Sequence, residues 1–137
     1  MAETFQSLVS IDSVSREEGR LARELAKSLS KLGAETRFDT AGEKVGGDTG
    51  NLIAWLKGTV TLPPLLLSAH MDTVEPGKGV TAVLRNGIFT SDGTTILGAD
   101  DKSALAIILE TLHVLKEERI VHGPLGIVFS ICEEVGL

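Results

Sequence analysis

The stretch Leu65-Leu66-Leu67-Ser68-Ala69-His70-Met71-Asp72 decides the fold class of this 137-residue chain. It is a short apolar run that ends abruptly in polar residues, and Pro63-Pro64 breaks the chain just before it. A continuous apolar run of this length is typical of a strand buried on both faces of a sheet. We therefore predict such a strand over 65–70, with His70 and Asp72 at its carboxyl end.

The segment that follows predicts a crossover to a second strand. Residues 102–119 carry apolar side chains at helical spacing, and after Gly123-Pro124 the run 125–131 repeats the buried-strand pattern. Strand, helix and strand in this order favour a right-handed βαβ unit. This predicts an α/β fold with a mainly parallel sheet flanked by helices. Between the two strands, Asn86-Gly87 indicates a hairpin near 80–90.

The first sixty residues are predicted to add helices and further strands to the same domain. The expected elements are helices at 4–11 and 16–32, strands at 34–39 and 51–56, and a glycine-rich loop at 42–50. Ser15 is a candidate N-cap for the second helix, and Gly33 is its predicted stop. No internal repeat or linker divides the chain, so we expect residues 1–137 to belong to one domain.

Composition and charge exclude several classes of partner. The chain has 13 basic and 19 acidic side chains, a net charge of −6. This balance argues against nucleic acid and against an anionic membrane surface, because both require clustered Lys and Arg. No apolar run approaches the ~20 residues of a membrane span, and the first residues lack a basic signal-peptide start. The single cysteine, Cys132, excludes an internal disulfide. These features favour a cytoplasmic protein.

Acidic residues and one histidine stand at the ends of the predicted elements. They are His70, Asp72, Asp100, Asp101, Glu133 and Glu134. Sites in open α/β sheets form outside the carboxyl ends of the strands, so we expect these side chains to meet at one edge. Five carboxylates there would repel one another unless a cation neutralised them. The pattern therefore predicts a metal site.

Two of the three pairs of residues also have a simpler interpretation, whereas Glu133 and Glu134 are not expected to be core residues. In extended chain His70 and Asp72 share a face, so Asp72 can fix the tautomer of a ligating His70, but a surface histidine beside a turn has the same pattern. Asp100-Asp101 alone is better explained as helix capping. Alternation sends Glu133 and Glu134 to opposite faces, so a shared role requires a bend. One could then bind metal while the other acts as general base.

Other motifs do not support a different chemistry. The stretch Gly93–Gly98 has the glycine spacing of a phosphate-binding loop, but Ala99 stands where lysine is required. The chain has no His-Glu-x-x-His, Cys-x-x-Cys or Gly-x-Ser-x-Gly sequence. We interpret His113 and His122 as structural, and Cys132 as a small core residue.

Taken in order, three motifs resemble the co-catalytic zinc peptidases. The motifs are Ser68-Ala-His-Met-Asp-Thr-Val74, Thr95-Ile-Leu-Gly-Ala-Asp-Asp-Lys-Ser103 and Glu133-Glu-Val-Gly-Leu137. The family includes peptidase T (a tripeptide aminopeptidase), carboxypeptidase G, acetylornithine deacetylase and succinyl-diaminopimelate desuccinylase. The Gly-Ala-Asp-Asp-Lys form is most similar to that of peptidase T-like members.

This resemblance implies a role for each site residue. The implied metal ligands are His70, Asp100 and Glu134, with Asp100 shared between two zinc ions; cobalt or manganese could replace zinc. Asp72 is implied to orient His70, and Glu133 to be the general base that takes a proton from the attacking water. Asp101 is implied to follow Asp100 through a cis peptide bond and to have a structural role near the site.

The implied function is hydrolysis of short peptides, most of all tripeptides at a free N-terminus. A zinc-dependent N-deacylase or carboxypeptidase, and a non-catalytic binding protein on the same fold, are the alternatives. The resemblance makes residues 1–137 the N-terminal portion of a catalytic domain, without the lid domain, the C-terminal half and two further metal ligands. We therefore expect this segment alone to be inactive, and its parent to form a homodimer through the lid.

Overall fold

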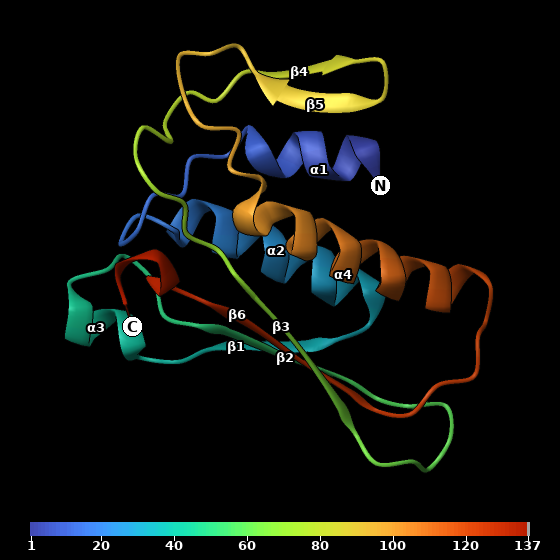
Figure 1. The fold of residues 1–137 in the computed structure, drawn as a ribbon. Helices are drawn as coiled ribbons and strands as arrows, with labels where there is room; N and C mark the ends of the chain where they lie inside the picture. Colours follow the sequence, from blue (N-terminus) through green and yellow to red (C-terminus); the bar gives the residue numbers. More distant parts are fainter. Residues whose placement is uncertain (137) are drawn as a thin grey trace.

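Residues 1–136 are described by a computed structural model, in which they build a four-stranded sheet in the order β1-β2-β6-β3 (Figure 1). The strands are β1 (Glu35–Phe38), β2 (Leu52–Leu56), β3 (Leu65–His70) and β6 (Leu125–Ser130). β3 and β6 pair parallel, as the crossover predicts, whereas β1–β2 and β2–β6 pair antiparallel. The predicted α/β architecture with flanking helices is confirmed. The sheet is mixed rather than mainly parallel, because β3–β6 is the one parallel pairing of the three in the described sheet.

The helices gather on one side of this sheet (Figure 1). They are α1 (Ala2–Val9), α2 (Gly19–Leu32) and α4 (Ala99–Glu117), with the short α3 (Ala41–Val45) and the 3₁₀ helix η1 (Glu133–Val135) near the ends of strands. The predicted loop over 42–50 thus begins within α3. None of the helices in residues 1–136 has both the length and the apolar character needed to cross a bilayer.

The core lies between α2, α4 and the sheet. Leu21, Leu25 and Leu29 recur every four residues along α2, are fully buried, and belong to the same hydrophobic cluster as Leu52 and Phe129 of the sheet. This is the spacing that places side chains on one face of a helix. Leu137 lies outside the described residues.

The ends of α2 differ in how well the sequence predicted them. Gly33 ends the helix with φ 101°, a left-handed conformation that glycine adopts readily, so the predicted stop is confirmed. The predicted start is wrong. α2 begins at Gly19 rather than at residue 16, and its N-cap residue Glu18 makes no side-chain cap hydrogen bond. The hydroxyl of Ser15 donates a hydrogen bond to Asp72 instead.

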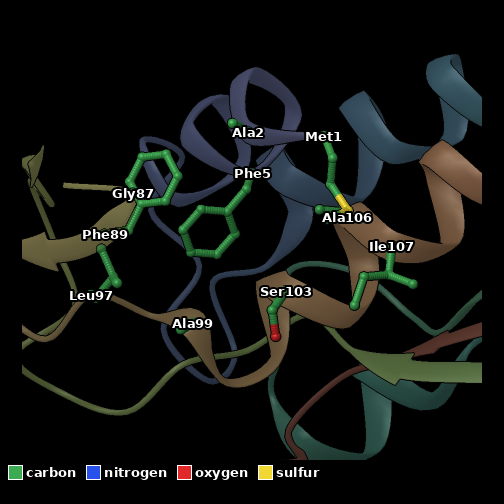
Figure 2. Close-up of a pocket in the computed structure, with 10 residues that line it drawn as sticks. All are labelled: Met1, Ala2, Phe5, Gly87, Phe89, Leu97, Ala99, Ser103, Ala106 and Ile107. Carbon is green, nitrogen blue, oxygen red and sulfur yellow. The ribbon is translucent and has the colours of Figure 1, made fainter. Parts of the chain in front are cut away.

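The predicted hairpin forms a separate two-stranded sheet of β4 (Ala82–Arg85) and β5 (Ile88–Ser91). Its turn residues, Asn86 and Gly87, have φ of 51° and 78°, the positive values that a tight hairpin turn requires. The Phe89 ring packs edge-on against Phe5 of α1 at 5.1 Å between centroids. An apolar pocket of about 440 Å³ lies between the hairpin, α1 and α4 (Figure 2).

β3 is less buried than its sequence predicts. Leu65 and Leu66 are 58% and 65% exposed, whereas Ala69 and His70 at the other end are 6% and 8% exposed. The prediction of burial on both faces is therefore wrong for the amino end. In the described chain β3 is an edge strand with β6 as its neighbour, and the helices cover one face of the sheet.

Candidate metal centre

His70 is the last residue of β3, and the chain after it fixes the orientation of its ring. The ring atom Nδ1 lies 2.9 Å from the main-chain oxygen of Asp72 and 3.3 Å from the Oδ1 atom of the same residue. A carbonyl oxygen only accepts, so Nδ1 carries the hydrogen and donates it. The other nitrogen, Nε2, faces Asp100 Oδ1 at 3.1 Å and Glu133 Oε2 at 3.8 Å. Nε2 is therefore the ring atom available to a metal.

The charges around His70 change its proton affinity. Burial alone would lower the pKa of the imidazole, but the hydrogen bond to Asp100 and the charges of Asp72 and Asp101 outweigh burial and raise the pKa. Without a metal, these carboxylates thus stabilise a proton on the ring. A cation at Nε2 would take the place of that proton among the same carboxylates.

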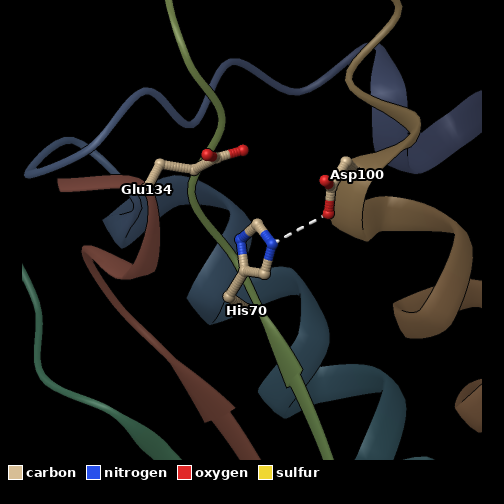
Figure 3. Close-up of side chains that lie close together, drawn as sticks. All are labelled: His70, Asp100 and Glu134. Atoms are coloured by element: carbon tan, nitrogen blue, oxygen red, sulfur yellow. Dashed lines mark hydrogen bonds and ion pairs between the residues drawn. The ribbon is translucent and has the colours of Figure 1, made fainter. Parts of the chain in front are cut away.

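Asp100 and Asp101 stand in the first turn of α4 but interrupt its helical geometry. Their φ/ψ values are −86°/106° and −117°/28°, and the peptide bond between them is cis, as the resemblance implies. α4 has no side-chain cap hydrogen bond, so the simpler interpretation of this pair as caps is wrong. The Asp100 side chain is 85% exposed and points toward His70 (Figure 3).

The chain bends directly after β6, as a shared role for the two glutamates requires. We call residues 131–134 the acid turn. Cys132 has φ 57° and ψ 27°, a left-handed conformation, and η1 follows at once. Because the strand ends there, Glu133 and Glu134 do not alternate between faces, and the Glu134 carboxylate points toward His70 (Figure 3).

The carboxylate of Asp72 holds this bend. Oδ1 accepts the amide of Glu133 at 2.9 Å, and Oδ2 accepts the amide of Glu134 at 3.1 Å and the hydroxyl of Ser15 at 2.7 Å. The sequence suggested that the Asp72 side chain fixes the His70 tautomer. In the structure the shorter contact to His70 is made by the main-chain oxygen, and the fully buried carboxylate chiefly positions the acid turn.

The donor atoms of His70, Asp100 and Glu134 all lie within 4.8 Å of one another. The three residues come from the end of β3, the start of α4 and the acid turn. One imidazole nitrogen and two carboxylates form a donor set that suits a divalent metal such as zinc. The residues present therefore fit a metal. Of the other candidate residues, Glu133 is 57% exposed beside this group, and Asp101 acts on His70 through its charge.

Some residues near the site were missed or assigned differently from the sequence. Lys102 follows the aspartate pair and is almost fully buried, and its Nζ donates to the main-chain oxygen of Ile11 at 2.6 Å. Burial lowers the pKa of Lys102 to about 8. The sequence pattern did not predict the hydrogen bond from Lys102 to Ile11, because its acceptor is a main-chain oxygen. Cys132 is fully buried, as predicted for a core residue, and burial raises the pKa of its thiol.

Comparisons with known proteins give a consistent result. Residues 51–137 match the family described as Peptidase family M28. A Bacillus subtilis (strain 168) protein described as uncharacterized protein YqjE is 44% identical over 137 residues, which is 100% of this chain and 37% of that protein. The chain thus spans little more than a third of the length of this relative.

Two solved structures share the fold of the chain. The aminopeptidase PepT from Bacillus cereus ATCC 10987 matches with a TM-score of 0.96 and 39% identity, over 98% of this chain and 36% of that one. A tripeptidase from Staphylococcus aureus matches with a TM-score of 0.95 and 40% identity, over the same two shares of 98% and 36%. The predicted catalytic-domain fold is confirmed by both.

Proposed function

The chain belongs to peptidase family M28, and we propose that it is the metal-binding N-terminal portion of the catalytic domain of an aminopeptidase acting on short peptides, tripeptides above all. The observation that carries the proposal is the convergence of His70, Asp100 and Glu134 donor atoms within 4.8 Å. These residues come from the three motifs on which the family resemblance rests.

We propose that the site would hold two zinc ions, with His70, Asp100 and Glu134 among their ligands. Bound zinc supplies Lewis acidity to the peptide carbonyl and makes water a better nucleophile at neutral pH. Glu133, beside His70 Nε2 and half-exposed, takes the proton from the attacking water as general base. Asp72 keeps the imidazole oriented through its main-chain oxygen and keeps both glutamates in place through its carboxylate.

The choice of substrate rests on the relatives. The two similar solved structures are described as an aminopeptidase and a tripeptidase, which favours a free peptide N-terminus over the N-acyl group of a deacylase. The convergence of metal donors favours an enzyme over a binding protein on the same fold. We further propose a cytoplasmic location, because the single cysteine suits a reducing compartment.

We also propose that two more metal ligands and a lid domain lie outside residues 1–137, because the similar relatives are nearly three times as long. On this proposal the segment alone is inactive, and the parent protein dimerises through the lid.

The test is tripeptide hydrolysis by the full-length protein that contains residues 1–137, loaded with zinc. We expect release of the N-terminal residue, loss of release with a chelator, and no cleavage of the same tripeptide with an acetylated N-terminus. Cleavage of N-acyl amino acids instead would favour the deacylase. Two bound zinc ions per chain with no hydrolysis of either substrate would contradict the proposal.

A further inference from the structure

Four consecutive main-chain amides of the acid turn each donate to a side-chain oxygen from elsewhere in the chain. The amides of Glu133 and Glu134 go to Asp72. The amide of Ile131 donates to Asn51 Oδ1 at 3.0 Å, and the amide of Cys132 donates to Glu18 Oε1 at 3.0 Å. Neither Asn51 nor Glu18 belongs to the three metal-site motifs.

These acceptors matter because the turn has little support of its own. Cys132 adopts a left-handed conformation that residues with a side chain rarely take. The main-chain bonds that follow are the weak 3.4 Å contact from Val135 to Cys132 and the 3.0 Å bond from Gly136 to Glu133. If the strand continued, alternation would separate the two glutamates. The side-chain acceptors therefore select the bend that brings both glutamates to the site.

Glu18 is placed for this task by α2. It stands directly before the helix, is fully buried, and also accepts from the Cys132 Sγ at 3.6 Å. Its Oε2 has no hydrogen-bond partner within residues 1–136. A buried carboxylate is costly unless its hydrogen bonds offset the lost hydration. Glu18 makes no cap bond to α2, so its bonds to Cys132 are the contacts that offset this cost.

Asn51 is held in one orientation by a second acid. Its Nδ2 donates to Asp39 Oδ2 at 2.8 Å, and the main-chain amide of Asn51 donates to Asp39 Oδ1 at 2.8 Å. Because Nδ2 must face the carboxylate, Oδ1 must face the opposite direction, toward the Ile131 amide. The amide side chain is thus fixed as an acceptor for the first residue of the acid turn.

We propose that Glu18 and Asn51 are positioning residues of the metal centre, which act through the main chain of the acid turn to set the Glu134 carboxylate against His70 and Asp100. The inference rests on the proposed function in that it takes these three residues as metal ligands. Glu18 lies before the family match at 51–137, and Asn51 is the first residue of that match.

The test uses cobalt(II) bound to the full-length protein that contains residues 1–137, because its visible absorption reports the geometry of the ligands. Glu18→Leu removes the acceptor at similar volume, Glu18→Gln keeps one acceptor oxygen, and Asn51→Ala removes the second acceptor. The matched control is Asp48→Ala, which removes the acceptor of the neighbouring Gly19 amide (2.8 Å) without touching the acid turn.

We expect Glu18→Leu and Asn51→Ala to bind cobalt about tenfold more weakly, as changes behind metal ligands do, with a changed visible spectrum. Glu18→Gln should restore most of the affinity and the spectrum, and Asp48→Ala should leave both unchanged. If Asn51 had a purely structural role, Asn51→Ala and the control Asp48→Ala would both lower the stability of the protein, and neither would change the cobalt spectrum.

Wild-type affinity and spectrum in folded Asn51→Ala and in folded Glu18→Leu would overturn the inference. If Glu18→Leu does not fold, Asn51→Ala decides the result alone. A different result would contradict the proposed function: a wild-type protein that binds cobalt or zinc but cleaves no peptide. In that case the cobalt readout still decides whether Glu18 and Asn51 position the ligands.

Discussion

The two ends of β3 share one strand and one neighbour but have opposite surroundings. Both pair with β6, Leu65 opposite Leu125 and His70 opposite Ser130. The apolar amino end is open to solvent, and the polar carboxyl end is covered. Cover at the carboxyl end comes from the start of α4, from the acid turn and from the segment around Val14, which bridges to Thr73.

This difference shows that the burial of a strand residue depends on whether another layer covers it. Strand pairing or hydrophobicity alone does not determine burial. On the face away from the helices, Gly126 is the register partner of both Trp55 and Leu66. Both of these large side chains are exposed. The packed end of the strand is the end that carries the candidate metal centre, where a side chain must be held in one place.

The largest effect is expected at the covered end of β3, from a change of Glu133. Glu133→Gln should lower kcat for tripeptide hydrolysis by about a thousandfold, within the range for removal of a general base. Bound metal, measured by elemental analysis, should stay at the wild-type level, because Glu133 is not among the three proposed ligands. The matched control is Glu117→Gln, at an exposed acid on α4. Wild-type turnover in Glu133→Gln would remove this residue from the mechanism.

The next largest effect is expected on stability, from a change in the core beside the covered end of β3. Phe129 is fully buried on β6 opposite Ala69. Phe129→Ala should lower the free energy of unfolding by about 3–5 kcal/mol, because it removes a large buried side chain and leaves a cavity. Urea denaturation followed by circular dichroism measures this value. A loss below about 1 kcal/mol would mean that this end is not tightly packed.

A smaller effect, on zinc affinity, tests the contribution of the acid turn apart from the rest of the covered end. Asp72→Asn replaces one carboxylate oxygen with an amide NH2 group, which donates and cannot accept from the acid turn. We expect zinc affinity to fall about 10–100-fold, as for other residues that hold metal ligands in place. Competition with a chromogenic chelator measures the affinity. Unchanged affinity would show that the two glutamates keep their positions without this carboxylate.

The smallest effect is expected at the open end. Leu66→Ala, at a side chain that is 65% exposed, should change the free energy of unfolding by only about 0.5 kcal/mol. The same urea denaturation as for Phe129→Ala gives a direct comparison. A loss similar to that of Phe129→Ala would show that this face is covered in solution, and the contrast between the two ends would disappear.

Local patterns explain what the sequence could predict. The hairpin turn at Asn86-Gly87 and the stop at Gly33 depend on adjacent residues, and both are confirmed. The crossover from β3 to β6 follows from helical and strand periodicity. The edge position of β3 could not be predicted, because it depends on which other strands and helices are present.

The same division applies to the candidate site. Acids and a histidine at the ends of predicted elements predicted a shared edge, and the family resemblance singled out His70, Asp100 and Glu134 among them. The structure brings these three together. Glu18 was not predicted because its partner is a main-chain amide 114 residues away, and Asn51 bonds one 80 residues away. Main-chain amides are present at every residue except proline, so the sequence carries no mark of which one a side chain will bind.

The bond between Glu18 and Cys132 also sets the order of events during synthesis. The two residues are 114 positions apart, so the ribosome must translate that whole interval before the pair can form. Contacts of such sequence separation form late, because the intervening chain must first lose its freedom. The nascent chain therefore carries His70 and Asp100 before it has a finished third donor. The three-donor set of His70, Asp100 and Glu134 should therefore be complete only after Glu134 has left the exit tunnel, which makes the first metal binding by this set a marker of completed folding in residues 1–136.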